Sequence, residues 1–296
     1  MAYTMTTDIS RMIVAGQKEI FLKNHDPYPI EYPEFTTKKT AKQKTETYDS
    51  MGNLQAASEK VEGGNISYGK VGQAYQTSIT NKTWSNGYSV TLEATKYDLY
   101  GCIKSVKAKE LARTMRELEE NNAIYWIDNA FAVNLTDGVP LCTNSRPLAN
   151  VTGTYNDTLT TGGLTPDNFK TGISMFTQFL NHAGGPMRSR VSDGLTHAYN
   201  MLTVEEIMKS ELKAYELTNT SNQLPKLTWH YSSYMNSTSP WFLWDRNYEH
   251  ILMQWFMGTV FDSDEDKINS KNLYMNAISM YNTGCLNNIG IIGSAG

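Results

Sequence analysis

The chain has 296 residues, of which 40% are hydrophobic and 19% are charged, and its formal net charge is −4 at pH 7. These values are typical of a globular protein with a sizeable core and exclude a disordered chain, while the negative charge argues against a general nucleic-acid binder. Residues 36–116 nevertheless hold 13 lysines and arginines against 7 acidic residues, so one face can meet a polyanion.

The cysteines and the first residues indicate where the protein folds. Cys102, Cys142 and Cys285 are odd in number and widely separated, which fits neither a disulfide framework nor a zinc site. The opening residues, MAYTMTTDISRMIVAG, lack the apolar core of a signal peptide, and no apolar run is long enough to cross a membrane. We therefore expect folding in a reducing cytoplasm and no contact with a membrane.

Residues 1–45 are predicted to form an arm. A short amphipathic segment at residues 9–21 is followed by the proline-containing NHDPYPIEYPEF and the basic KKTAKQK. Because prolines prevent a helix there, we expect extended chain that lies on a surface and is stabilised by neighbouring subunits. The basic stretch contributes Lys38, Lys39, Lys42 and Lys44.

The alternation of residues 48–92 predicts a hairpin. Residues 75, 77 and 79 would lie opposite Tyr88, Val90 and Leu92, and TNKTWSNG would supply the turn.

The stretch GGNISYGKVG, residues 63–72, has the spacing of a phosphate-binding loop. Gly64, Gly69 and Lys70 match G-x-x-x-x-G-K, but Val71 stands where a Ser or Thr would hold magnesium. A polar segment precedes the stretch, and the strand-like QAYQTSIT follows it where a helix is required. We interpret the stretch as an exposed glycine-rich loop and keep a nucleotide-dependent enzyme as an alternative.

Residues 99–131 are predicted to form one long helix of about 45 Å. Its apolar stripe has a spacing of three to four residues and comprises Ala108, Leu111, Ala112, Met115, Leu118, Asn122, Tyr125 and Trp126. We expect Leu111, Met115 and Leu118 to pack on a sheet formed by strands near Val90 and Ile278. Glu119 is predicted to face solvent.

Helices and strands mix in the second half of the chain. After the turn-rich residues 137–148, Thr165 and Pro166 predict the start of a helix that ends near His182. A further helix is expected at residues 203–215. Strands are predicted at residues 227–231, at 241–245 and in the alternating LYMNAISMYNTG. The pattern predicts an α+β protein whose early and late strands bracket a helical middle.

No catalytic, cofactor or metal site is predicted. The segment DSDEDKINSKNL, residues 262–273, begins like a calcium loop, but Lys267 replaces the required glycine and Leu273 the bidentate glutamate. The 5 histidines lack metal-binding spacing. Ser294, in IGSAG, is interpreted as part of a flexible tail, and the aromatic residues 241–244 as a buried strand.

Four stretches, in matching order, carry a resemblance to a known family. They are GYSVTLEATKYDLYG, DGVPLCTNSRPL, TSPWFLWDR and NNIGIIGSAG. Together they resemble the major capsid protein of tailed bacteriophages, with its Hong Kong 97-like fold, and in particular the Mu-like head-subunit branch. Arg146 stands where that branch usually has His.

The resemblance implies an L-shaped subunit. Its expected parts are an N-terminal arm (1–45), an extended loop hairpin (46–86), a peripheral domain with a long spine helix (87–160), an axial domain (161–255), and a return strand of the peripheral domain with a C-terminal tail (256–296). The loop tip would contact a neighbouring subunit through Gly63, Gly64, Tyr68, Gly69 and Lys70. The arm lysines would face DNA.

The function implied is that of a structural major capsid protein. Pentamers and hexamers of the chain would form an icosahedral shell around double-stranded DNA, contacted without sequence specificity. A portal and separate scaffolding or decoration proteins would be partners, and assembly would take place in the cytoplasm of a host bacterium. Two alternatives stay open: an encapsulin-like compartment shell, and a nucleotide-binding enzyme using Gly64 to Lys70.

Overall fold

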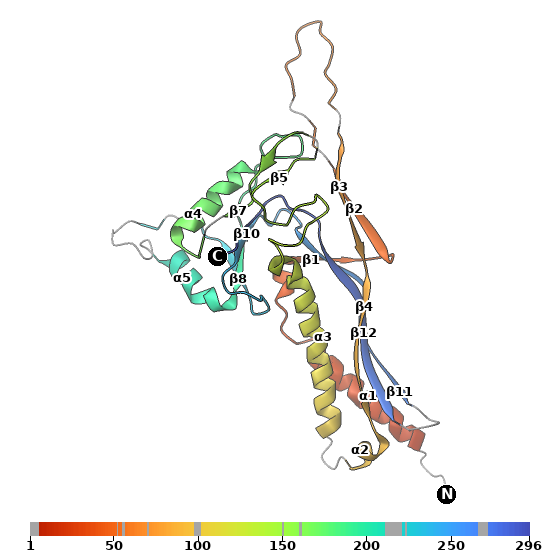
Figure 1. The fold of residues 1–296 in the computed structure, drawn as a ribbon. Coiled ribbons are helices and arrows are strands. Elements are labelled where there is room, and N and C mark those ends of the chain that lie inside the picture. Colours follow the sequence, from red (N-terminus) through yellow and green to blue (C-terminus); the bar gives the residue numbers. More distant parts are fainter. Residues whose placement is uncertain are drawn as a thin grey trace.

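The computed structural model describes residues 6–51, 53–54, 57–69, 71–97, 102–149, 151–159, 162–210, 221–222, 224–265 and 272–296. The chain forms two lobes and a long loop that projects away from both (Figure 1). Each lobe is built around its own sheet, and segments from both ends of the chain take part in them.

A four-stranded sheet with the order β1-β11-β12-β4 organises the first lobe. Its strands are β1 (Thr36–Thr40), β4 (Lys82–Val90), β11 (Ile251–Glu265) and β12 (Leu273–Cys285). β1 runs parallel to β11, and the other neighbours are antiparallel. Two helices, α1 (Thr6–His25) and α3 (Cys102–Asp128), pack on this sheet.

One face of this sheet is covered by the helices because its side chains alternate. Along β12 the residues Leu273, Met275 and Ala277 are buried, whereas the intervening Tyr274 is exposed. Successive side chains of a strand point to opposite faces. The buried set forms one cluster with Phe21 of α1 and with Leu111, Ala112 and Met115 of α3.

The second lobe contains a five-stranded sheet with the order β7-β13-β10-β8-β9. Its strands are β7 (Thr158–Leu159), β8 (Asp193–His197), β9 (Thr228–Ser232), β10 (Trp241–Trp244) and β13 (Ile291–Ser294). Two helices, α4 (Pro166–Met175) and α5 (Met201–Lys209), belong to this lobe. Phe169 of α4 stacks on Trp241 with ring centroids 5.2 Å apart.

Shorter elements complete the chain. A separate hairpin is formed by β2 and β3, and a small one by β5 and β6. The elements are the 3-10 helices η1 (Tyr32–Glu34), η2 (Phe176–Gln178) and η3 (Ala198–Asn200), the helix α2 (Leu92–Tyr97), and the strands β2 (Thr45–Met51), β3 (Gln73–Thr80), β5 (Arg146–Pro147) and β6 (Thr154–Tyr155).

Several predicted elements are confirmed. The long helix is present as α3, and the fold is a mixture of helices and sheets. Thr165 caps α4, since its side-chain oxygen accepts a hydrogen bond from the Asn168 N–H at 3.3 Å. This helix ends at Met175, earlier than predicted. Strands β9 and β10 lie where the sequence indicates, and β12 matches the late alternating segment.

The predicted hairpin of residues 75–92 is wrong. β3 pairs with β2, and β4 pairs with β12, so the chain passes from one sheet to another at Asn81. Of the residues expected in the turn, Thr80 ends β3 and residues 82–87 lie in β4. Gly87 allows a close approach between strands, since a Cβ there would lie 2.8 Å from the Met275 carbonyl oxygen.

Within residues 6–45 the chain packs on its own subunit, which differs from the expected arm that neighbouring subunits stabilise. α1 is a helix of 20 residues whose Phe21 is fully buried against α3 and the sheet. β1 adds a parallel strand to the same sheet. The prolines follow α1 instead of interrupting it, so an amphipathic helix fits before them.

The C-terminal segment is not a flexible tail. β13 lies between β7 and β10, and Ser294 is completely buried. The Ser294 hydroxyl donates to the Gly162 carbonyl at 2.7 Å. In the acidic segment, residues 262–265 lie in β11 and not in a loop, and residues 266–271 lie outside the described residues.

Candidate functional site

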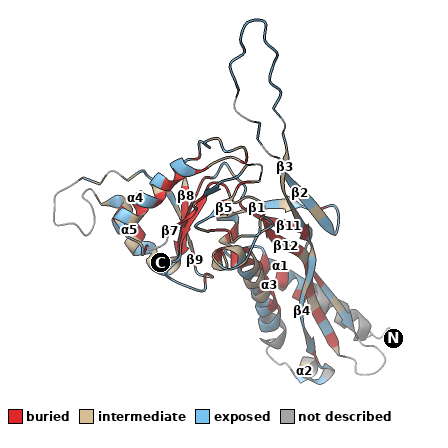
Figure 2. Ribbon diagram, turned by 45° about the horizontal axis from the view of Figure 1, so that its top comes forward, coloured by how far each residue is buried: buried red, intermediate tan, exposed pale blue. Residues whose placement is uncertain are grey.

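The loop between β2 and β3 is highly exposed. Residues 57–69 are all exposed, and Figure 2 shows this loop extending beyond the buried interior of both lobes. Side chains normally found in cores lie on it, with Tyr68 88% and Val61 74% exposed. An exposed group of apolar side chains marks an interaction surface.

A tight turn forms the tip of this loop. The Gly64 N–H donates to the Val61 carbonyl at 2.9 Å, and Gly63 has a φ of +77°. Glycine is favoured at the third position of a type II turn because other residues are strained at this φ. Gly63, Gly64, Tyr68 and Gly69, expected to contact a neighbour, therefore share the exposed loop, whereas Lys70 lies outside the described residues.

The geometry does not build a phosphate-binding loop. No strand or helix lies in the described residues between β2 and β3, and β3 begins at Gln73, shortly after Gly69. A phosphate-binding loop needs the N-terminus of a helix at that place. The spacing of Gly64, Gly69 and Lys70 therefore has no matching structure in the described part of this loop.

The base of the loop is fixed to the first lobe. The Tyr48 hydroxyl donates to Gln254 Oε1 at 3.0 Å, and the Gln254 amide donates to the Ile79 carbonyl at 3.4 Å. The hydroxyls of Thr77 and Thr136 form a further hydrogen bond at 3.2 Å. The β2–β3 ladder also has a register shift between Asp49 and Met51. The hairpin thus has an anchored base and an exposed far end.

The four basic residues do not form one patch. Lys38 and Lys39 are neighbours in β1, so their side chains point to opposite faces of the sheet. The Lys38 ammonium lies 4.9 Å from the centre of the Trp255 ring, whereas Lys39 pairs with Glu249. Lys42 and Lys44 follow β1 and are exposed. Contact of these residues with DNA stays a prediction.

The core of α3 differs from the predicted stripe in its second half. Leu111 and Met115 are buried, but Leu118 is only half-buried. Glu119, predicted to face solvent, is completely buried. The buried side continues through Ala123, Ile124 and Ile127, because the second half of α3 contacts both lobes.

Two adjacent glutamates of α3 hold the first lobe together. Glu119 accepts hydrogen bonds from Arg116 at 2.7 Å and from the Thr259 hydroxyl at 3.1 Å. Glu120 accepts the backbone N–H groups of Glu31 at 2.7 Å and Tyr32 at 3.0 Å. Burial raises the pKa of the Glu120 carboxyl to about 7. No sequence signal marked either role, because Glu119 was expected to face solvent and Glu120 lies outside the predicted apolar stripe.

The N-terminal segment is tied to the second lobe as well. His230 of β9 lies 2.9 Å from the Glu34 carboxylate and 3.1 Å from that of Asp193. The Ser233 N–H donates to the Glu31 carboxylate at 2.9 Å. His230 is therefore buried because it links the N-terminal segment to the second lobe.

Arg146 lies in a buried charge network. Its guanidinium donates to Asp157 at 2.5 Å, to Asp137, and to the carbonyls of Pro140 and Leu141. Arg146, Asp137 and Asp157 are at most 2% exposed. The network holds together the segment that connects α3 to the second lobe. In the sequence, Arg146 was noted only as the residue that stands where the resembled branch usually has His.

Neither a metal cluster nor a membrane-spanning helix occurs in the described residues. Across the described ranges, no three His, Cys, Asp or Glu side chains lie together as a metal ion would require. No helix in the same part of the chain is both long and apolar enough to span a membrane. Cys142 and Cys285 are free and buried, and burial raises the pKa of both thiols.

Comparisons with known proteins identify the fold. The sequence matches no family model and no curated protein. Its structure is similar to the mature capsid of bacteriophage PhiM1, with a TM-score of 0.58, 9% identity, and coverage of 90% of this chain and 87% of that one. It is also similar to the capsid of a native GTA particle, with a TM-score of 0.56, 9% identity, and coverage of 89% of this chain and 89% of that one.

A third similar structure comes from an archaeon. The virus-like particle of Pyrococcus furiosus gives a TM-score of 0.55 at 8% identity, covering 95% of this chain and 98% of that one. At such identities the likeness is one of fold, and the Mu-like branch stays a prediction. The two lobes, the long helix and the extended loop thus form the Hong Kong 97-like fold of phage major capsid proteins.

Proposed function

We propose that the chain is the structural major capsid protein of a tailed bacteriophage. Copies assemble as pentamers and hexamers into an icosahedral shell that encloses double-stranded DNA. The support is the fold, which this chain shares with phage capsid subunits over nine-tenths of its length. As a shell subunit the chain works by assembly and not by catalysis.

The extended loop is the observation that carries this proposal. Leu54, Val61, Ile66 and Tyr68 are each at least 59% exposed on a segment that projects from both lobes. Ordering such a segment costs conformational entropy, which apolar burial within the chain does not offset here. A neighbouring copy supplies the missing burial.

The partners and the location follow from the same proposal. Lys38, Lys42 and Lys44 are exposed cations that suit non-specific contact with packaged DNA. A portal and separate scaffolding or decoration proteins complete the particle. The location is the virion capsid, after assembly in the cytoplasm of the host bacterium.

A compartment shell of the encapsulin type is the second candidate. It is favoured by the similarity to the Pyrococcus furiosus particle, of which 98% is covered. Such a shell would hold cargo protein where a phage head holds a genome. The third alternative is a nucleotide-dependent enzyme. The described residues that directly follow Gly69 form no helix, which its phosphate-binding loop would need.

Electron microscopy of the purified protein tests the proposal. We expect closed particles with five-fold and six-fold capsomers. Particles isolated from a native source should contain double-stranded DNA, and cargo protein without DNA would favour the compartment. Protein that stays monomeric under all assembly conditions would contradict both shell functions.

A further inference from the structure

The segment SNG, which was expected in a turn, lies in the middle of strand β4. This strand is at the edge of the four-stranded sheet and pairs with β12 along one side. Asn86 and Gly87 are both exposed. Asparagine is a chemically labile residue, and glycine has no Cβ that would shield its own backbone nitrogen. A reactive pair of residues is therefore open to solvent on an edge strand.

The side chain of Asn86 is folded toward the next peptide group. The Gly87 N–H donates to Asn86 Oδ1 at 2.9 Å, so the backbone nitrogen lies beside the side-chain amide carbon. The Asn86 amide group also donates to the Thr114 hydroxyl at 3.1 Å. This second hydrogen bond links β4 to α3.

The sheet requires glycine at position 87. A Cβ there would lie 2.8 Å from the Met275 carbonyl oxygen of β12. Glycine within a strand commonly marks such a close approach of two backbones. The packing of β4 on β12 thus keeps the least shielded kind of nitrogen directly after an exposed asparagine.

Two other pairs in the chain have the same spacing of carbonyl and nitrogen, Asp137–Gly138 and Asp193–Gly194. Their side chains are at most 2% exposed and are paired with arginines. A carboxylate also lacks the amino group that an amide can release. Of the three pairs, Asn86–Gly87 is the one that combines exposure with a leaving group.

We propose that Asn86–Gly87 is a site of spontaneous deamidation, with water as the co-reactant. The Gly87 nitrogen loses its proton to solvent base and bonds to the Asn86 side-chain carbonyl carbon. The bond from that carbon to the amino nitrogen breaks, and the nitrogen takes up a proton and leaves as ammonia. Water then opens the cyclic imide at either carbonyl, which gives aspartate or isoaspartate.

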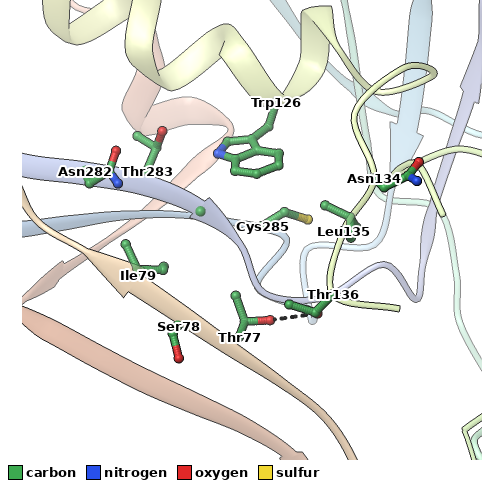
Figure 3. Close-up of a pocket in the computed structure, with 11 residues that line it drawn as sticks. Thr77, Ser78, Ile79, Trp126, Asn134, Leu135, Thr136, Asn282, Thr283 and Cys285 are labelled. Carbon is green, nitrogen blue, oxygen red and sulfur yellow. Dashed lines mark hydrogen bonds between the residues drawn. The ribbon is translucent and has the colours of Figure 1, made fainter. Parts of the chain in front are cut away.

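Ring closure requires β4 to detach locally from β12, because the Gly87 nitrogen must turn toward the side chain. A strand that is paired on one side opens more readily than a central strand. Asn282 is the contrasting case (Figure 3). It lies in the central strand β12, its amide donates to the Thr80 carbonyl at 2.8 Å, and Thr283 follows it. We expect Asn282 to keep its amide.

The products change the contacts of the edge strand. Aspartate has no amide N–H for the Thr114 hydroxyl, and it adds a negative charge to the surface of the first lobe. Isoaspartate also adds one carbon to the backbone of β4, which disturbs the ladder opposite Ala277. Deamidation therefore loosens β4 from its neighbours. The inference concerns the single subunit and does not rest on the proposed function.

Peptide mapping by mass spectrometry tests the proposal. The intact protein is incubated in mildly alkaline buffer made with water that carries heavy oxygen, so that an amide lost in this step is labelled. Trypsin then releases Asn86 in residues 83–96 and Asn236 in residues 227–246, each as the only asparagine of its peptide. Asn236 is the matched control, because it is exposed but is followed by Ser237.

We expect the labelled acid to accumulate several-fold faster at Asn86 than at Asn236. Equal rates at the two positions would overturn the proposal. Conversion of Asn86 only after denaturation would also overturn it, because the edge strand would then protect the amide fully.

A variant separates deamidation from other damage during incubation. Asn86→Gln keeps an amide on the surface but cannot close a five-membered ring, so this peptide should stay unlabelled. Hydrogen exchange of the β4 amides should become faster in incubated wild type and stay unchanged in the incubated variant. The same loss of protection in both proteins would contradict a loosening caused by deamidation.

Discussion

The four-stranded sheet and the extended loop are both made of extended chain, but they are stabilised differently. In β11 and β12 the ladder runs from Ile251 opposite Cys285 to Glu265 opposite Leu273, with Tyr281 completely buried. In the loop the Gly64 N–H donates to the Val61 carbonyl in a turn, and Tyr68 is 88% exposed. The hydrogen bonds between β11 and β12 form within one chain, whereas the apolar side chains of the loop stay exposed to solvent.

This difference indicates what each region is for. The sheet with α1 and α3 is a rigid support, because its apolar side is closed by helices from the same chain. The loop carries exposed apolar side chains, as interaction surfaces do. Changes in the support should act on folding, and changes in the loop should act on assembly.

The largest loss of stability is expected from Arg146→Ala. The change leaves Asp137 and Asp157 buried without their cation, which typically costs about 3–5 kcal/mol. Chemical denaturation of the unassembled subunit measures it. Arg113→Ala is the control, because its ion pairs with Glu110 and Glu117 are exposed or half-exposed and are worth at most about 1 kcal/mol. Equal effects of the two changes would contradict the role of the buried network.

A slightly smaller effect is expected from Leu111→Ala. This leucine is 4% exposed in the cluster between α3 and the sheet, so its truncation should cost about 2–5 kcal/mol. Leu118→Ala, at a half-buried position of the same helix, should cost clearly less. A larger loss at Leu118 would mean that the buried face of α3 is assigned wrongly.

The stability should also depend on pH through Glu120. Its pKa is raised from 4.5 to about 7, so its stabilising contribution is fully present below about pH 4.5 and is lost as the pH rises to about 7. Glu120→Gln should remove this part of the slope in unfolding free energy between those pH values. Identical slopes for wild type and variant would contradict a buried, proton-binding carboxyl at this position.

The smallest change in stability is expected from Ile66→Ser. This side chain is 59% exposed on the loop, so the unfolding free energy of the free subunit should change by less than about 0.5 kcal/mol. The yield of particles should nevertheless fall, because the apolar surface of the tip is reduced. Ser67→Ala, at the next position, should affect neither quantity. Normal assembly of the Ile66 variant would show that the tip does not contribute to the interface.

Local patterns predicted the elements that depend on local chemistry. The apolar spacing of α3 and the Thr165–Pro166 start of α4 follow from side chains close in sequence. The exposed glycine-rich loop could also be predicted, because its residues show no apolar periodicity that would indicate a helix or strand.

Long-range contacts account for what could not be predicted. β4 pairs with a strand that lies 183 residues later at one end of the ladder, where Val90 is opposite Leu273. The burial of Glu119 depends on Arg116 and Thr259, and Thr259 belongs to a distant strand.

Hydrogen exchange in free subunits and in assembled particles tests the central claim most directly. We expect the amides of residues 57–69 to exchange without protection in the free subunit and to become protected in particles. The amides of β11 and β12 should be protected in both states, because their ladder lies within one chain. Protection of the loop in the free subunit, or its continued exposure in particles, would contradict a loop that is completed by a neighbouring copy.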